Sequence, residues 1–300
     1  MYSPQRASRS EFAPLRHLNY HLRTWGTPSA SQPPLVMVHG WMDVSASFQF
    51  VVDAFAEDRH IVAPDWRGYG LTDWPRTDGY WFADYLADLD AVIDHIAPNQ
   101  PVDLLGHSMG GNVAMLYSGV RPERVRKLIN LEGFGMPATR PAQAPGRLAR
   151  WMDELKALHR GDTVLRPYAS ADGVARRLMK TNPRLTQDKA DWLARHWARE
   201  TASGEWEILG DPAHKLTNPQ LYRVEEVLEI YRRITAPVLA VDASDNSLEK
   251  WWNGQYTLAE YYERLKAVPT LQTAHIHDAG HMLHHDQPGA VAQAVAAFLA

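Results

Sequence analysis

Residues 106–111 read Gly-His-Ser-Met-Gly-Gly, and this stretch decides the fold. It follows a short apolar run, Pro101–Leu105, and leads into a helical pattern, Asn112–Val120. A serine with glycine two residues before and after it, on a sharp turn from strand to helix, is held in a strained backbone conformation with its oxygen exposed. Because Gly-x-Ser-x-Gly alone occurs often by chance, its position between strand and helix is what favours a nucleophilic Ser108 over an ordinary loop serine.

Length and composition set the class of protein. The 300 residues suit one large α/β domain, or a core with an inserted subdomain. The hydrophobic fraction is 45%, the charged fraction 22% and the net charge −4, which is ordinary for a globular protein and gives no basic surface for nucleic acid. Because cysteine is absent, disulfides, zinc–thiolate sites and cysteine nucleophiles are excluded.

The sequence shows no sign of a targeting or membrane segment. Residues 1–11 are polar and lack the apolar centre of a secretory signal. No apolar run approaches the ~20 residues that cross a bilayer. We therefore expect a cytoplasmic protein with no membrane or nucleic acid partner, and the sequence makes no prediction about oligomeric state.

Short β-rich runs alternate with helical patterns such as Phe82–Ile96 along most of the chain. Apolar strands separated by helices predict an α/β fold with a mostly parallel sheet covered on both faces. Right-handed crossovers place the carboxyl ends of such strands on one edge, where ligands bind. The expected strands are His17–Trp25, Leu35–Val38, Ile61–Ala63, Val102–Leu105, Lys127–Leu131, Val238–Val241 and Thr273–His277.

The alternation stops between about residues 137 and 234, where the sequence reads as helices only. The three-four spacing of Leu148, Trp151 and Leu155 is typical of an amphipathic helix. We expect residues 137–234 to form a helical cap over the carboxyl edge of the sheet, inserted between core segments 1–136 and 235–300. A helical layer on the back of the sheet is the alternative.

His281 is the best candidate for the base that a serine hydroxyl needs at neutral pH. It ends the run Asp-Ala-Gly-His, directly after the last expected strand. The chain order of nucleophile, acid and histidine matches a Ser-His-acid triad on an α/β sheet. His277 is a weaker rival, and His284 and His285 are expected to pack or to face solvent.

Two carboxylates could hold the histidine in its working tautomer and stabilise the imidazolium. Asp245 follows the expected strand Val238–Val241, and Glu132 follows Lys127–Leu131. We favour Asp245 as the triad acid and keep Glu132 as the alternative. The unused carboxylate would cap a turn or support the histidine loop.

An oxyanion hole needs two backbone N–H groups. Met109 follows the nucleophile at a helix N-terminus and is expected to supply one. The loop after Leu35–Val38 reads His-Gly-Trp-Met-Asp, and Trp41 is expected to supply the other. Gly40 would let the backbone approach the substrate.

The remaining motifs receive structural interpretations. Asp65 and Arg67 are expected to brace a loop. The histidines of residues 277–285 lack a matching carboxylate or cysteine set, and no glycine-rich loop is placed for a phosphate, so we predict no metal and no cofactor. Tryptophans such as Trp151 and Trp251 would partly line the cleft beneath the cap, which suggests a small-molecule substrate with an apolar acyl or aromatic group.

From about Leu18 to the C-terminus, the chain resembles the α/β-hydrolase superfamily. The resemblance implies an eight-stranded core, a helical cap and a Ser-His-acid triad without a cofactor. It is closest to serine hydrolase-like proteins and esterases of the capped branch that also holds haloalkane dehalogenases and epoxide hydrolases. Those two enzyme types use aspartate at the position of Ser108, so both chemistries are disfavoured. The matching stretches are His39-Gly40, Asp65-x-Arg67-Gly68-x-Gly70, residues 106–111 and Gly280-His281.

Two departures from the family pattern concern the acid. The usual motif has glycine three residues before the aspartate, where this chain has Asp242. Dehalogenase-like members can carry their acid at the position that corresponds to Glu132. Both departures weaken the assignment of Asp245 and keep Glu132 in place as its rival.

The sequence therefore predicts a serine hydrolase that cleaves carboxylic esters through an acyl-enzyme. The same triad suits hydrolysis of C–C bonds, lactones or amides and cofactor-free perhydrolysis, because a fold does not choose between these reactions. A small-molecule receptor on a hydrolase scaffold is the alternative from another class.

Overall fold

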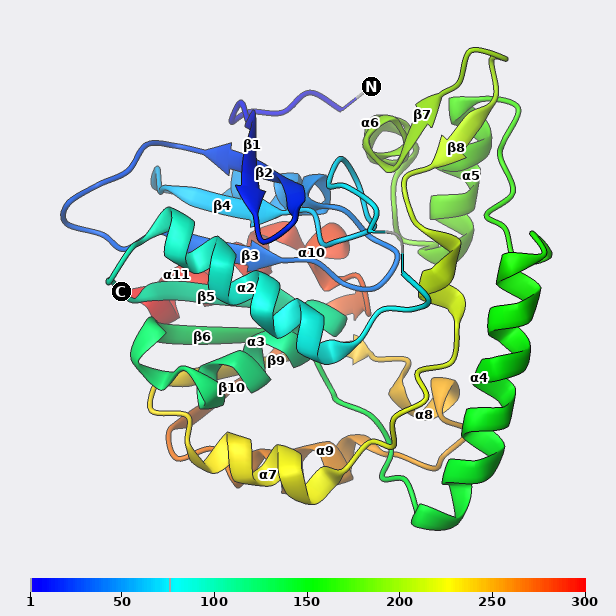
Figure 1. The fold of residues 1–300 in the computed structure, drawn as a ribbon. Coiled ribbons are helices and arrows are strands. Elements are labelled where there is room, and N and C mark those ends of the chain that lie inside the picture. The colour runs from blue at the N-terminus through cyan, green and yellow to red at the C-terminus, as the bar shows by residue number, and fades with distance from the viewer. Residues whose placement is uncertain (1, 76) are drawn as a thin grey trace.

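A computed structural model describes residues 2–75 and 77–300, and it contains an eight-stranded sheet in the order β1-β2-β4-β3-β5-β6-β9-β10 (Figure 1). The β1–β2 and β2–β4 pairs are antiparallel and the remaining pairs are parallel. The predicted mostly parallel, eight-stranded α/β sheet is confirmed. The strands are β1 (Arg9–Leu15), β2 (Leu18–Trp25), β3 (Leu35–Val38), β4 (Ile61–Pro64), β5 (Val102–His107), β6 (Val125–Leu131), β9 (Val238–Asp245) and β10 (Leu271–Gly280).

Different helices cover the two faces of this sheet, because side chains alternate along each strand. Val36 and Val38 of β3 pack in the layer that contains α2, α3, α7 and α9. Leu35 and Met37 pack with α1 and α11 on the opposite face. These helices are α1 (Gln49–Ala54), α2 (Phe82–Ile96), α3 (Met109–Val120), α7 (Val224–Arg232), α9 (Leu258–Leu265) and α11 (Pro288–Leu299), and two short ones, α8 (Leu248–Trp251) and α10 (Leu283–Asp286), lie near the carboxyl edge.

The first strand, β1, is absent from the sequence prediction. Its first four residues are exposed, and it pairs only with β2 at the edge of the sheet. An edge strand with one solvated face does not need the continuous apolar run that marks the inner strands. The alternation of a short polar strand was too weak a signal to separate it from a polar terminus.

The segment between β6 and β9 is not helical throughout, so the expectation of helices only is wrong. It contains α4 (Ala144–His159), α5 (Ala171–Thr181) and α6 (Gln187–Trp197), followed by an antiparallel hairpin of β7 (Ala198–Glu200) and β8 (Trp206–Ile208). Gly204, at a φ of 83°, lies in the hairpin turn. Two backbone hydrogen bonds between Trp206 and Tyr168, of 2.7 and 2.9 Å, extend the pairing. Strands of three residues are too short to show a period.

The inserted segment meets the core in two different ways. Helices α5 and α6 share a buried cluster with Val44 and Phe50 from the region after β3. Helix α7 instead packs on α3, where a Cβ at Gly119 would lie 2.1 Å from the carbonyl oxygen of Ile230. Helix α4 has no buried residue and lies at the periphery, away from the sheet (Figure 1). The division at residues 137 and 234 stays a prediction, but α7 belongs by packing to the helical layer of the core.

Candidate active site

Ser108 lies on the turn between β5 and α3 and adopts a φ of 53° and a ψ of −117°. The turn is tight on both sides of the serine. A Cβ at Gly106 would lie 2.3 Å from the carbonyl oxygen of Gly110, and one at Gly110 would lie 2.2 Å from that of Val38. Only glycine fits at these two positions, and the strained serine between them is held by the packing of strand against helix.

His281 reaches the serine from the loop between β10 and α10. Its Nε2 atom lies 2.9 Å from the Oγ atom of Ser108. Its Nδ1 atom lies 2.7 Å from the Oε2 atom of Glu132. When Glu132 is ionised it can only accept a hydrogen bond, so Nδ1 carries the proton and Nε2 is left to accept from the serine hydroxyl.

Glu132 is buried at the end of β6, with a side-chain exposure of 0%. Its Oε1 atom accepts a 2.8 Å hydrogen bond from the backbone N–H of Ala243 in β9, and its backbone has a φ of 52°. Both carboxylate oxygens are therefore engaged, one by the neighbouring strand and one by His281.

Burial shifts the pKa of both Glu132 and His281. It raises the pKa of Glu132 to about 8, against the opposing hydrogen bond from Ala243. It lowers the pKa of His281 to about 3, so the imidazole is neutral at neutral pH. Desolvation thus disfavours the charged form of each group, whereas the 2.7 Å contact favours a carboxylate that faces an N–H. A neutral imidazole is the form that can take a proton from serine.

Asp245, the acid favoured from the sequence, is not brought to His281. Its carboxylate lies 3.1 Å from the guanidinium of Arg184, and its side chain is 66% exposed. The two carboxylates differ in where they stand along neighbouring strands, and this explains why only Glu132 reaches His281. Asp245 is the last residue of β9, beyond the point where β6 pairs with it, whereas Glu132 follows β6 directly beside β5. The geometry replaces Asp245 with Glu132 beside the histidine.

The two expected oxyanion donors belong to segments that lie next to Ser108. Met109 is the first residue of α3. Trp41 follows Gly40, where an added Cβ would lie 3.1 Å from the Cβ of Ser108. Among the residues that the structure describes, neither backbone N–H donates a hydrogen bond to another residue. His39 holds this loop, because it bonds to the carbonyl of Gly40 at 2.8 Å.

His281 has two further neighbours in the structure, and sequence reasoning gave a role near the site to only one of them. His107, inside the serine motif, bonds through Nε2 to the carbonyl of His281 at 2.8 Å. Trp251 of α8 packs edge-on against the ring of His281, with centroids 4.3 Å apart. Sequence reasoning missed His107, although its position beside Ser108 was a usable signal. Trp251 was among the tryptophans expected to line the cleft, but nothing in the sequence predicted its contact with His281.

The other histidines of the C-terminal group have different environments. His284 and His285 are fully buried, which fits the packing interpretation. His277 lies on the exposed side of β10 beside His275, with ring centroids 4.9 Å apart.

The expected brace between Asp65 and Arg67 is not formed. Arg67 binds Asp88 of α2 through Nε and Nη2, at 2.5 and 2.7 Å. Asp65 binds the Nδ1 atom of His21 at 2.7 Å and accepts a 2.9 Å hydrogen bond from the backbone N–H of Leu71, so it braces the loop, although not through Arg67. Two residues apart on a tight loop, the two side chains turn to different partners.

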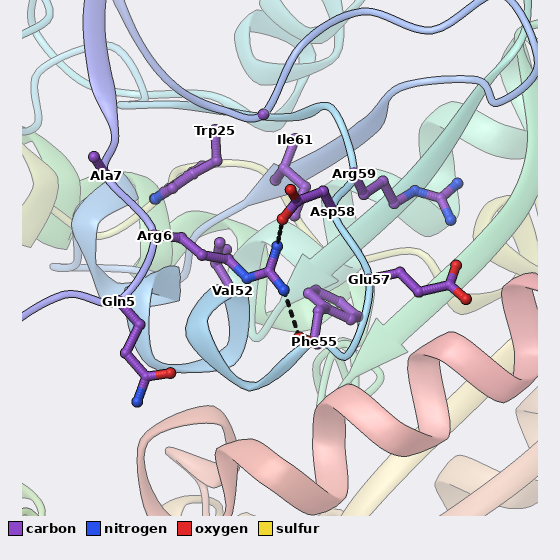
Figure 2. Close-up of a pocket in the computed structure, with 11 residues that line it drawn as sticks. Gln5, Arg6, Ala7, Trp25, Val52, Phe55, Glu57, Asp58, Arg59 and Ile61 are labelled. Atoms are coloured by element: carbon purple, nitrogen blue, oxygen red, sulfur yellow. Dashed lines mark hydrogen bonds and ion pairs between the residues drawn. The ribbon is translucent and has the colours of Figure 1, made fainter.

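Two cavities lie away from Ser108. One, of about 270 Å³, opens near the amino ends of the parallel strands, where Trp25, Phe55 and Ile61 meet Arg6 (Figure 2). The other, of about 250 Å³, lies between β2 and the β7–β8 hairpin. Neither of these two cavities is lined by Ser108, His281 or Glu132, so the candidate site is identified by the hydrogen bonds of these three residues.

Side-chain exposure is high beside the trio. Trp41 is 53% exposed and Trp251 is 47% exposed.

Among the helices of residues 2–75 and 77–300, none is both long and apolar enough to cross a bilayer.

The chain is similar to several known proteins along most of its length. A serine hydrolase-like protein of Danio rerio is 28% identical over 92% of this chain and 84% of its own length. A 3-hydroxybutyrate-oligomer hydrolase of Cupriavidus necator is 27% identical over 93% of this chain and 92% of its own length. The crystal structure of a hypothetical protein of Pseudomonas aeruginosa PAO1 superposes with a TM-score of 0.81 at 26% identity, covering 96% of this chain and 97% of that one.

The family described as alpha/beta hydrolase fold matches residues 33–288. This span contains the serine turn, the histidine loop and the whole inserted segment, and it exceeds half of the 300 residues. The chain belongs to the alpha/beta hydrolase fold family.

Proposed function

We propose that this protein is a serine hydrolase that cleaves carboxylic esters through an acyl-enzyme. The observation that carries the proposal is a continuous hydrogen-bonded line from Glu132 through His281 to Ser108, with distances of 2.7 and 2.9 Å. A nucleophile, a base and a group that orients the base are the three parts that acyl transfer requires.

In the acylation step the Oγ atom of Ser108 attacks the ester carbonyl carbon while its proton moves to Nε2 of His281. Glu132 stabilises the resulting imidazolium through Nδ1–H. The backbone N–H groups of Trp41 and Met109 receive the oxyanion of the tetrahedral intermediate. When the intermediate collapses, Nε2 returns the proton to the departing alcohol.

In the deacylation step water takes the place of the alcohol. His281 removes a proton from water, the hydroxide oxygen attacks the acyl carbon, and the proton returns to Ser108 as the carboxylic acid leaves. Every proton transfer uses the Nε2 atom of His281, so this cycle needs no other acid or base.

The substrate side of the proposal is an apolar acyl or aromatic group. The exposed rings of Trp41 and Trp251 lie beside the serine loop and the histidine, where they offer flat apolar contacts. The relative named as a hydrolase of 3-hydroxybutyrate oligomers covers nearly the whole chain, so such oligomers belong among the first substrates to test.

Ester turnover by Ser108→Ala tests the proposal. We expect the wild type to hydrolyse short p-nitrophenyl esters with an initial burst of p-nitrophenol, and a fluorophosphonate probe to label it. Ser108→Ala is expected to lose both properties, whereas Ser203→Ala, in the exposed hairpin turn, retains them. Turnover that survives in Ser108→Ala would refute the nucleophile. Tight small-molecule binding without turnover on a broad ester panel would instead support a receptor.

A further inference from the structure

A buried polar cluster lies directly behind the proposed triad. Asp43, His107 and His284, here called the Asp43 cluster, each offer a ligand atom, and these atoms lie within 4.8 Å of one another. They come from the loop after β3, the end of β5 and the short helix α10. All three side chains are buried, with exposures of 3%, 2% and 0%.

The bonding of this cluster is incomplete. The Oδ1 atom of Asp43 accepts from the N–H of Val44 and from Nε1 of Trp197, both at 2.9 Å. Its Oδ2 atom has no hydrogen-bond partner among the described residues. His107 uses Nε2 for the carbonyl of His281, so the lone pair lies on Nδ1, which is likewise unpartnered.

His284 completes the arrangement. Its Nε2 atom lies 4.0 Å from Oδ2 of Asp43 and 3.4 Å from the hydroxyl of Ser47, and within residues 2–75 and 77–300 its Nδ1 atom has no partner. A buried carboxylate oxygen and an imidazole lone pair are both acceptors, and leaving them unpaired destabilises the fold. A proton or a cation between them would satisfy both.

We propose that Asp43, His107 and His284 bind a transition-metal ion of the zinc class. Two imidazole nitrogens with one carboxylate oxygen suit Zn²⁺, Co²⁺ or Ni²⁺, whereas Mg²⁺ and Ca²⁺ prefer oxygen ligands alone. Tetrahedral ligands at about 2.1 Å from zinc lie about 3.4 Å apart. Nε2 of His284 and Oδ2 of Asp43 are 4.0 Å apart and no pair of ligand atoms exceeds 4.8 Å, so side-chain rotations that draw these atoms together by about 1 Å would complete the site.

Such an ion would inhibit the proposed ester hydrolysis. His107 is bonded to the carbonyl of His281, and their ring centroids are 4.8 Å apart. A divalent charge beside that ring disfavours the imidazolium that forms on His281 during acylation. The inhibition rests on the proposed function, but the binding of the metal does not.

The exposed pair of His275 and His277 is the rival metal site, since its rings are 4.9 Å apart. It lacks the burial of the Asp43 cluster, and Nδ1 of His275 already faces Asp242 at 3.1 Å. A His277→Gln variant removes this site without touching the Asp43 cluster, so it serves as the matched control.

Binding is tested with Co²⁺, whose visible absorption reports its ligands, in the Ser108→Ala background. We expect one equivalent of Co²⁺, displaced by Zn²⁺, with an affinity at least tenfold weaker in Asp43→Asn and in His284→Gln and unchanged in His277→Gln. Loss of binding in His277→Gln alone, or the lack of a one-equivalent site in the parent protein, would overturn the proposal.

Zinc-edge anomalous diffraction from zinc-soaked crystals of the otherwise unmodified chain covers the case in which a variant does not fold. A peak between Asp43, His107 and His284 is expected, and a peak elsewhere or none overturns the site. In parallel, one equivalent of Zn²⁺ should slow ester turnover of the wild type at least tenfold, reversibly with a chelator. Metal binding without inhibition overturns the inhibition and leaves the site standing.

Discussion

At the scale of single residues, the choice between Glu132 and Asp245 depends on strand neighbours. Both carboxylates follow strands, and the sequence places both at the carboxyl edge. Glu132 follows β6, which pairs with β5, the strand that leads into Ser108. Asp245 ends β9, one strand further away, and turns outward to Arg184. The order of strands in the sheet, which a single sequence does not reveal, decides which acid faces His281.

Exchange of the two acids for amides is the first test at this scale. Glu132→Gln should lower kcat for ester hydrolysis by roughly 10⁴-fold, because the introduced amide donates to Nδ1 and fixes the wrong imidazole tautomer. Asp245→Asn is the matched control and should change kcat by less than about threefold, because it breaks only an exposed ion pair. A collapse of kcat in Asp245→Asn with Glu132→Gln intact would contradict the assignment.

The pH dependence follows from the buried pair. The working form has an ionised Glu132 and a neutral His281. Burial raises the pKa of Glu132 to about 8 and lowers that of His281, so the first proton taken up as the pH falls goes to the carboxylate and removes the working form. We expect kcat/KM to decline as the pH falls below about 8. A profile that stays flat from pH 9 to pH 6 would show that Glu132 is still ionised and His281 still neutral at pH 6, which would contradict the raised pKa of Glu132.

At the scale of elements, the tightness of the serine turn makes a stability prediction. Gly106→Ala should destabilise the protein by about 3 kcal/mol or more, because the new methyl group would overlap the carbonyl of Gly110. Gly146→Ala in α4 is the matched control, since nothing lies within 4 Å of an added Cβ there. It should stabilise the helix by roughly 0.5–1 kcal/mol. Urea unfolding measures both, and equal stability of the two variants would refute the close-contact explanation.

Which elements could be predicted depends on burial and length. The inner strands, such as β3, are short apolar runs buried on both faces, and the sequence prediction for Leu35–Val38 matches β3 residue for residue. The edge strand β1 and the hairpin β7–β8 were missed, because one is solvated and the other has strands of only three residues. Chain order was enough to predict that Ser108 and His281 meet, whereas the partner of the histidine required the geometry of the sheet.

At the scale of the whole molecule, buried ion pairs join distant parts of the chain. Asp88 of α2 binds Arg67 from the loop after β4, Tyr20 of β2 and Arg16 from the β1–β2 turn. Asp88 is itself fully buried. One carboxylate thus connects two strands near one edge of the sheet, the loop after β4 and a covering helix.

Replacement of Asp88 should therefore lower the free energy of unfolding without changing ester turnover by the folded protein. Asp88→Leu removes the buried carboxylate that faces the Arg67 guanidinium and leaves it beside the part-exposed Asp84, at 3.3 Å, so we expect a loss of about 3 kcal/mol in the free energy of unfolding. The double variant Arg67→Met/Asp88→Leu should recover most of that loss, because no unpaired charge remains.

Asp153→Asn, which breaks the exposed pair with Lys156, is the control and should change stability by less than about 0.5 kcal/mol. Ester turnover per folded molecule should stay within about twofold in all three variants, because the hydrogen bonds of Asp88 and the ion pair of Asp153 do not include Ser108, His281 or Glu132. A double variant no more stable than Asp88→Leu would show that the shape of this network, and not its charge, stabilises the fold.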